Sequence, residues 1–180
     1  MGLKVAIVGM SPDRNGIPWA DPEWEKWGMP WDGEWARFDR AFELHDPSSF
    51  GDDCYPKGYK ERLFNIPKLY LQRKQDEFPN SLTYPLGEVI ESVGMDYFQS
   101  SAAYMIALAA HEGASDIAIY GLSMGDDTPY GYQRANAEYL IGIASGSGIT
   151  VHIQKPTSLC QYQPEQDFVD EYPLRYGWIK

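Results

Sequence analysis

Short apolar runs alternate with longer amphipathic segments along this chain, and each run has the length of a buried β-strand. The runs are rich in β-branched or aromatic side chains and are bounded by turn residues, as strands buried on both faces of a sheet are. They occupy residues 3–9, about 39–45, 67–72, 116–122 and 149–154. The pattern therefore predicts about five strands.

Two helices are predicted in the second half of the chain. Residues 97–113 are rich in alanine, with a serine cap candidate near the start and Gly113 at the end. Residues 129–148 begin with Pro129 in a first-turn position and carry apolar residues at 132, 135, 139, 140 and 143, which is a helical period. Alternation of these helices with strands predicts a single three-layer α/β domain of Rossmann-like type with a mainly parallel sheet.

Two long segments interrupt this pattern. Residues 10–37 are crowded with Trp, Pro and acidic residues and have room for only a short helix, near 22–28, and residues 46–66 form a second, polar insertion. Because long loops in compact domains are commonly functional, we expect both to cover a ligand. Residues 1–158 are expected to form the ligand-binding domain and residues 159–180 a surface tail, with a short helix or a subunit contact as the alternative for the tail.

Charge and hydropathy narrow the classes of partner. The 180 residues carry a formal charge of −11 at pH 7, whereas a nucleic-acid backbone requires a basic footprint, so we expect no general nucleic-acid binding. A local basic pocket for one small anion stays open. The longest apolar stretch, AAYMIALAA, is too short to span a membrane, and we expect a cytoplasmic protein. Apolar helices flanking a modest sheet leave self-association open.

Candidate chemistry gathers where strands end, because ligands of open parallel sheets bind beyond the carboxyl ends of the strands, near the point where strand order reverses. The second predicted strand ends in Glu43 and His45, which strand alternation places on one side, with Phe42 and Leu44 on the other. A carboxylate and an imidazole there suit acid/base catalysis or ribose binding. The alternative is a strand-end pair that holds the following loop.

The first strand and the alanine-rich helix contribute smaller signals. Gly9 permits a tight turn after the first strand, and Ser11 is a candidate donor to an anion, although the dinucleotide fingerprint GxGxxG is absent and a plain turn is equally consistent. Ser100 is a candidate anion contact at a helix start, with an ordinary cap as the favoured alternative.

The stretch 117–142 has the composition of a pocket wall. Gly121 leaves room for a ligand next to the backbone, Ser123 offers a hydroxyl, and Asp126 is a hydrogen-bond acceptor or a helix cap. Gln133 and Arg134 lie in the first turns of the next helix, where the helix dipole favours a phosphate. The alternative for Arg134 is a surface ion pair with Glu138, four residues on.

Metal signals are weak. The two cysteines and three histidines lack metal-ligand spacing. Asp126 and Asp127 would suit Mg²⁺ bound together with substrate phosphates, so a magnesium ion accompanying a phosphate ligand stays open.

The chain resembles uncharacterised Rossmann-like proteins of phages and prophages. The resemblance is carried by VAIVGMSP, DPEWEKWGM, RFDRAFELHD, SSAAYMIALAAHEGASDIAIYGLSM and YQRANAEYLIGIASGSGITVHI. A broader similarity is to nucleotide-handling groups, the SLOG proteins and the nucleoside deoxyribosyltransferases. The GGxGT-type loop of the SLOG group is absent, and the resemblance assigns no catalytic residue.

Three functions are consistent with these observations. The first is a protein that binds a nucleotide or nucleotide-derived phosphate at the carboxyl ends of the strands, such as a phage-encoded binder that sequesters a host signalling nucleotide. The second is a nucleotide-processing enzyme, a hydrolase or a glycosyl or deoxyribosyl transferase, that uses Glu43 and His45. The third is a structural or protein-interaction module.

Overall fold

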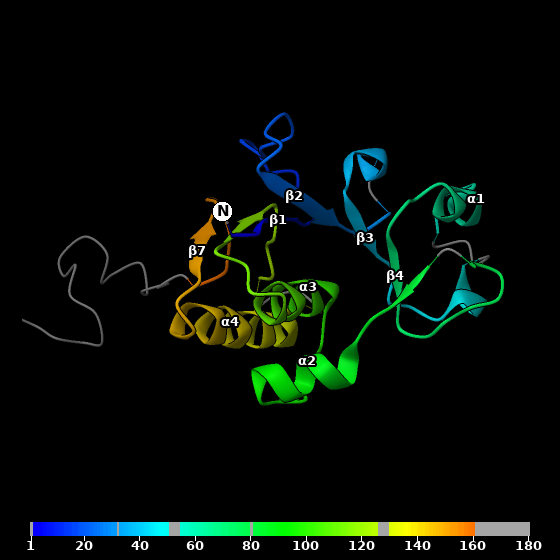
Figure 1. The fold of residues 1–180 in the computed structure, drawn as a ribbon. Coiled ribbons are helices and arrows are strands. Elements are labelled where there is room, and N and C mark those ends of the chain that lie inside the picture. Colours follow the sequence, from blue (N-terminus) through cyan, green and yellow to red (C-terminus); the bar gives the residue numbers. More distant parts are fainter. Residues whose placement is uncertain (1, 32, 51–54, 80, 126–129, 161–180) are drawn as a thin grey trace, which may run out of the picture.

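The computed structural model describes residues 2–31, 33–50, 55–79, 81–125 and 130–160 (Figure 1). The strands in this part of the chain are β1 (Lys4–Val8), β2 (Trp24–Gly28), β3 (Arg40–Phe42), β4 (Leu69–Leu71), β5 (Leu82–Thr83), β6 (Asp116–Tyr120) and β7 (Thr150–Ile153). The helices are α1 (Tyr59–Phe64), α2 (Leu86–Val93), α3 (Ser101–His111) and α4 (Gly131–Gly146), with short 3-10 turns η1 (Trp35–Arg37) and η2 (Pro47–Ser49).

The described strands form one seven-stranded sheet in the order β5-β4-β3-β2-β1-β6-β7, with every neighbouring pair parallel. The chain builds outward from β1 to β5, then returns to β6 on the other side of β1. The strand order therefore reverses between β1 and β6, which are in register from Lys4 opposite Asp116 to Val8 opposite Tyr120. The predicted parallel α/β fold is confirmed, with seven strands in place of about five.

Helices cover both faces of the sheet, which confirms the three-layer prediction. Alternate strand residues point to opposite faces. Phe42 and Tyr70 join a core cluster with residues of α2, α3 and α4, whereas Ala41, Leu69 and Leu71 join a second cluster with residues of α1. Figure 1 shows α2, α3 and α4 gathered along one side of the sheet, with α1 beyond β4.

The prediction of a short helix near residues 22–28 is wrong, because this segment forms β2 in the middle of the sheet. Its sequence, WEKWG, lacks the apolar character of a central strand. The charges are accommodated by pairing: Glu25 Oε2 accepts a hydrogen bond from Arg40 Nε at 2.7 Å, and Lys26 Nζ lies 3.1 Å from Asp39 Oδ2. Trp27 supplies the apolar contact and is fully buried.

The two predicted helices form with shorter bounds. The α3 helix begins at Ser101 because the side chain of Ser100 accepts a hydrogen bond from the Ala103 N–H. The α4 helix buries Ala137, Leu140, Ile141 and Ala144. Of the predicted apolar stripe, Tyr132, Ala135 and Tyr139 are exposed instead, because the buried face of α4 runs through Ala137, Leu140, Ile141 and Ala144.

The two insertions also carry structure. Residues 10–37 contain β2 and η1, and residues 46–66 contain η2 and α1. Their expected role as ligand covers stays a prediction. Among the described residues, no helix has the length and apolar character needed to cross a bilayer.

Candidate functional site at the carboxyl ends of β3 and β4

Glu43 and His45 form a hydrogen-bonded pair just beyond β3. Glu43 Oε1 accepts hydrogen bonds from the His45 backbone N–H at 3.0 Å and from His45 Nδ1 at 2.6 Å. The Tyr59 hydroxyl donates to the other carboxylate oxygen, Oε2. Glu43 is 1% exposed, whereas the His45 side chain is 58% exposed. The two side chains are thus in contact, although β3 ends at Phe42, before either of them. Their role as an acid/base or ribose-binding pair stays a prediction.

The surroundings of this pair set its protonation. The hydrogen bond to Glu43 raises the pKa of His45 above its ordinary value, although partial burial acts in the opposite direction. Burial raises the pKa of Tyr59 far above its ordinary value, and the Glu43 charge adds to this effect. Tyr59 therefore stays protonated as a donor, and the acceptor oxygen of Glu43 favours the His45 tautomer with hydrogen on Nδ1. Nε2 is then the nitrogen available for proton transfer.

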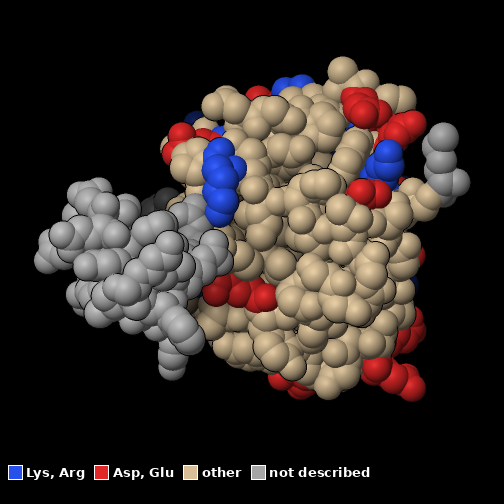
Figure 2. Space-filling model, turned by 90° about the vertical axis from the view of Figure 1, so that its left-hand side faces the viewer, with Lys and Arg blue, Asp and Glu red and all other residues tan. Residues whose placement is uncertain are grey.

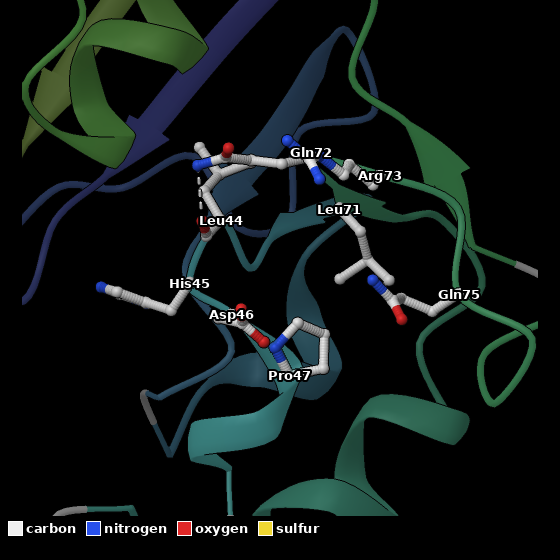
Figure 3. Close-up of a pocket in the computed structure, with 8 residues that line it drawn as sticks. All are labelled: Leu44, His45, Asp46, Pro47, Leu71, Gln72, Arg73 and Gln75. Carbon is white, nitrogen blue, oxygen red and sulfur yellow. Dashed lines mark hydrogen bonds between the residues drawn. The ribbon is translucent and has the colours of Figure 1, made fainter.

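A pocket of 380 Å³ opens beside His45 (Figure 3). It is lined by Leu44, His45, Asp46, Pro47, Leu71, Gln72, Arg73 and Gln75. Gln72 Nε2 donates to the Leu44 carbonyl oxygen at 2.7 Å, which joins the segments that follow β3 and β4. Figure 3 shows Gln72 and Arg73 on one side of the pocket and Asp46 and Pro47 on the other.

The lining combines several kinds of recognition chemistry. Arg73 is an exposed cation that suits a phosphate or carboxylate, and Gln75 adds an amide. Asp46 caps η2, and the Ser48 backbone N–H lowers the pKa of its carboxyl group, with the charge of Arg73 acting in the same direction. Leu71 and Pro47 give apolar surface. This combination suits a small polar ligand with an anionic group.

At the reversal point of the sheet, the loops after β1 and β6 bind each other. The Gly9 N–H donates to the Tyr120 carbonyl oxygen, and the Ser11 N–H donates to the Gly121 carbonyl oxygen, both at 2.8 Å. A Cβ on Gly121, which has a φ of +59°, would lie 2.8 Å from Arg14 Cβ. The space that Gly9 and Gly121 leave is thus filled by the opposite loop. Their predicted roles next to a ligand stay predictions.

The loop after β6 is held by the segment that follows β7. The Thr157 hydroxyl donates to the Leu122 carbonyl oxygen, and the Met124 N–H donates to Ser158 Oγ at 2.6 Å. Ser123 lies between these anchored residues and is exposed. Asp126 and Asp127 lie outside the described residues. Within those residues no group of three or more His, Cys, Asp or Glu side chains has the arrangement of a metal site.

The remaining predicted residues lie on the α3 and α4 side. Ser100 caps α3, which agrees with the helix cap that the sequence favours over an anion contact. Gln133 Nε2 lies 3.3 Å from the Tyr132 hydroxyl, and Arg134 Nε lies 3.6 Å from Glu138 Oε1 in the alternative i,i+4 pair. Strands β2 and β1 separate β3 from β6. The structure therefore does not bring this group together with Glu43 and His45.

Sequence reasoning missed Tyr59, Gln72 and Arg73 as candidate site residues. Tyr59 comes from the insertion after β3, where no periodic pattern indicates which side chain turns inward. Gln72 and Arg73 directly follow β4, and the rule that ligands bind at strand ends does place them at the end of the third predicted strand, but it gives neither residue a contact.

The surface on the β7 side has scattered charges (Figure 2). Lys and Arg side chains form separate spots there, with Asp and Glu between them. A continuous basic surface of the kind that phosphate backbones require is absent from the described residues of this face. The expectation of no general nucleic-acid binding stays a prediction.

Comparisons with known proteins reveal a shared fold. No protein-family model and no curated protein matches this chain. Among solved structures, the sialyltransferase CstII from Campylobacter jejuni in complex with the substrate analogue CMP-3FNeuAc is similar, with a TM-score of 0.56, 15% identity, and coverage of 85% of this chain and 80% of that chain. The CstII complex with cytidine-5'-monophosphate has a TM-score of 0.53, 13% identity, and coverage of 89% and 86%. The chain therefore shares the Rossmann-like fold of this nucleotide-handling enzyme.

Proposed function

We propose that this protein binds a nucleotide or nucleotide-derived phosphate in the pocket beside His45. The observation that carries the proposal is the joint presence of His45, Gln72 and Arg73 around one cavity at the carboxyl ends of β3 and β4. This edge of a parallel sheet is where such folds bind their ligands. The CMP compounds bound by the structural neighbour CstII support the same ligand class.

The phosphate is assigned to Arg73, and His45 lines the same pocket from the segment that follows β3. Arginine contacts phosphate oxygens with charge-assisted hydrogen bonds, and a protonated His45 adds a second positive charge. The raised pKa of His45 increases the fraction of the protein in which this charge is present near neutral pH. The amides of Gln72 and Gln75 are then placed to contact the sugar or base.

The predicted contacts on the α4 side serve a longer ligand in this proposal. Strands β3 and β6 are three strand spacings apart, about 14 Å at about 4.8 Å per spacing. A ligand held by its phosphate in the pocket would have to extend along the strand ends to contact Arg134. Gly9, Ser11, Gly121 and Ser123 lie along that path. Gln133 and Ser100 complete the proposed set on the far side, and Asp126, which lies outside the described residues, stays in the set on its sequence position alone.

A second candidate function is a nucleotide-processing enzyme, which the 2.6 Å contact between His45 Nδ1 and Glu43 Oε1 favours. A buried carboxylate that orients an imidazole is the arrangement of a general acid or base. In a hydrolase or glycosyl transferase, His45 Nε2 would take a proton from the attacking hydroxyl or give one to the leaving group. In a sequestering binder the same residue would only hold the ligand.

Thermal unfolding with a panel of nucleotides, cyclic nucleotides and nucleotide sugars, including CMP, tests the proposal. A ligand at a hundredfold excess over its dissociation constant stabilises the fold by about 2.7 kcal/mol. Mass spectrometry of the recovered ligand then separates the two versions, because a binder returns it intact and an enzyme returns a product. No stabilisation by any member of the panel would overturn the proposal and favour a protein-interaction module.

Variants of the pair refine the enzyme version. Glu43→Gln and His45→Gln are expected to abolish turnover of a processed ligand, whereas binding is expected to weaken only by the loss of the His45 contact, since Arg73 and Gln72 remain in place. The exchange Gln72→Leu is a useful contrast, because it alters the pocket without touching the acid/base pair. Normal turnover by both Glu43→Gln and His45→Gln would exclude the catalytic assignment.

A further inference from the structure

We infer that Tyr59 is the positioning residue for His45: its hydroxyl fixes the Glu43 carboxylate, and the carboxylate fixes the imidazole. The inference rests on the proposed function only in so far as His45 is to meet a ligand. The chain of hydrogen bonds from Tyr59 through Glu43 to His45, called the relay below, is present in the ligand-free protein. Through Tyr59, the insertion after β3 orients the Glu43 carboxylate and thereby the His45 side chain.

The contacts divide cleanly between the two carboxylate oxygens. Oε1 of Glu43 accepts from the backbone N–H and Nδ1 of His45, and Oε2 accepts from the Tyr59 hydroxyl. Glu43 and Tyr59 are each 1% exposed. A buried carboxylate requires hydrogen-bond donors, and each donor also limits how the group can rotate. Tyr59 therefore holds Oε2 in place while Oε1 faces the imidazole.

The position of Tyr59 is itself fixed by the end of β2. Tyr59 is the first residue of α1, and its ring packs against Trp31, Phe50 and Tyr55 with centroid distances of 5.0 to 5.7 Å. In the same helix, Arg62 Nη1 donates to the carbonyl oxygens of Pro30 at 2.7 Å and Trp31 at 3.2 Å. These bonds hold α1 against the segment that follows β2. The relay thus links the insertion, β2 and β3.

The chemistry of the three groups makes the relay directional. Tyr59 acts as the donor to Glu43, because burial and the adjacent charge keep its phenol protonated. Glu43 accepts, so the neutral His45 carries its hydrogen on Nδ1 and leaves Nε2 as its acceptor nitrogen. Among the described residues that line the pocket with His45, the other charged groups are Asp46 from its own segment and Arg73 from the end of β4. Neither is placed by Tyr59.

The test is nuclear magnetic resonance of the ring nitrogens of His45 in the ligand-free full chain, comparing the wild type with Tyr59→Phe. Phe keeps the ring packing and removes the hydroxyl. Glu43 then loses the donor that holds Oε2, so its hydrogen bond to Nδ1 weakens, and we expect the His45 titration to move downward toward its ordinary value. The Nδ1–H fraction of neutral His45 is expected to fall as the carboxylate gains freedom to rotate.

Tyr84→Phe is the matched control. Tyr84 is a buried tyrosine of the opposite core, where its hydroxyl donates to the Tyr104 carbonyl oxygen at 2.9 Å. This variant loses a comparable buried hydrogen bond and is expected to leave the His45 titration and tautomer unchanged. An unchanged His45 in Tyr59→Phe, or an equal change in Tyr84→Phe, would overturn the inference.

A wild-type measurement covers the case in which Tyr59→Phe does not fold. The Tyr59 hydroxyl proton, slowed in exchange by its burial, is expected to give a low-field resonance that moves as His45 titrates. If the Tyr59 hydroxyl resonance does not move as His45 titrates, the relay is wrong.

Binding of CMP, measured by calorimetry, keeps the two proposals distinguishable. In a double-mutant cycle, Tyr59→Phe is expected to change CMP affinity in the wild-type background and to have no effect in His45→Gln. An equal effect in both backgrounds contradicts the relay. If CMP and the other nucleotides fail to bind the wild type while Tyr59→Phe still moves the His45 titration, the proposed function fails and the positioning role stands.

Discussion

Gly9 and Gly121 approach so closely that a Cβ on Gly9 would lie 2.3 Å from the Gly121 carbonyl oxygen. This contact lies at the reversal point between β1 and β6, where open α/β sheets commonly have a ligand crevice. Here the loops after the two strands bind each other through backbone hydrogen bonds. The described pocket lies two strands away from β1, at β3 and β4.

Replacing Gly9 with Ala is therefore expected to destabilise the protein. The added methyl meets backbone atoms that cannot rotate away, and overpacking of this kind costs about 1–3 kcal/mol. Urea unfolding followed by circular dichroism measures the change. Gly142→Ala is the control: no described atom lies within 4 Å of the Cβ, and Gly142 is inside α4. That exchange should stabilise the fold by up to about 1 kcal/mol. Equal stability of Gly9→Ala and wild type would contradict the close approach.

Arg40 is a partly buried charge whose removal is expected to lower the free energy of unfolding. Its guanidinium contacts Glu25 Oε2 at 2.7 Å and Glu112 Oε1 at 2.6 Å and lies 4.6 Å from the ring centroid of Trp27, with only 12% of the side chain exposed. Arg40→Met leaves two partly buried carboxylates without their cation. We expect a loss of about 2–3 kcal/mol in the free energy of unfolding, somewhat below the value for fully buried pairs.

The matched control for Arg40 is Lys60→Met. The Lys60–Glu77 pair is 42% and 46% exposed, and exposed pairs contribute about 0–1 kcal/mol. Thermal or urea unfolding of both variants at low and moderate salt gives the comparison. Equal losses in the two variants would show that the Arg40 network is no more than an ordinary surface pair.

The sequence predicts those parts of this fold in which side-chain pattern and environment agree. The strands β1 and β6 are continuous apolar runs, which are typical of strands buried on both faces, and the placement of Glu43 with His45 follows from a period of two. In β2 the pattern fails, because Glu25 and Lys26 are neutralised by Arg40 and Asp39, residues distant in sequence. A single-sequence pattern contains no record of such pairing.

The candidate site is predictable to the same limited extent. Strand ends locate Glu43, His45 and the start of the pocket, since the chain itself marks where each apolar run stops. Tyr59 reaches Glu43 from 16 residues away through an aromatic insertion, and its direction depends on how α1 packs. In α4, Tyr132 and Tyr139 were assigned to the buried stripe, yet tyrosine is tolerated on either face.

The Glu43–His45 pair makes a pH-dependent contribution to stability. The hydrogen bond to Glu43 raises the pKa of His45 above 6.5 in the folded state. A group with a raised folded pKa stabilises the fold fully below its unfolded pKa, and this contribution is lost as the pH rises through the folded value. The difference in free energy of unfolding between wild type and His45→Gln should therefore be larger at pH 5.5 than at pH 8.5.

Urea unfolding of both proteins across this pH range measures the difference. The same comparison in a Glu43→Gln background isolates the pair, because the partner that raises the pKa is then uncharged. In that background the stability difference should lose most of its pH dependence. A difference that is flat with pH in the native background, or that grows toward pH 8.5, would contradict the assignment.

Arg73 and Arg134 lie at opposite ends of the proposed site, so a variant of each tests one end. Arg73 lines the pocket assigned to the phosphate, whereas Arg134 lies on α4 beside Glu138. Loss of one charge-assisted contact to a phosphate corresponds to about a tenfold loss of affinity or more. Arg73→Gln is therefore expected to weaken CMP binding at least tenfold, and Arg134→Gln to leave it within a factor of two.

A longer ligand should change this ranking. A CMP-linked sugar held by its phosphate in the pocket can extend along the strand ends toward α4, so Arg134→Gln is expected to weaken it although CMP is unaffected. Calorimetric titration of both variants with both compounds gives four affinities. If Arg134→Gln weakens CMP and Arg73→Gln does not, the phosphate binds at the start of α4, where the helix dipole and the predicted contacts Gln133 and Arg134 would hold it.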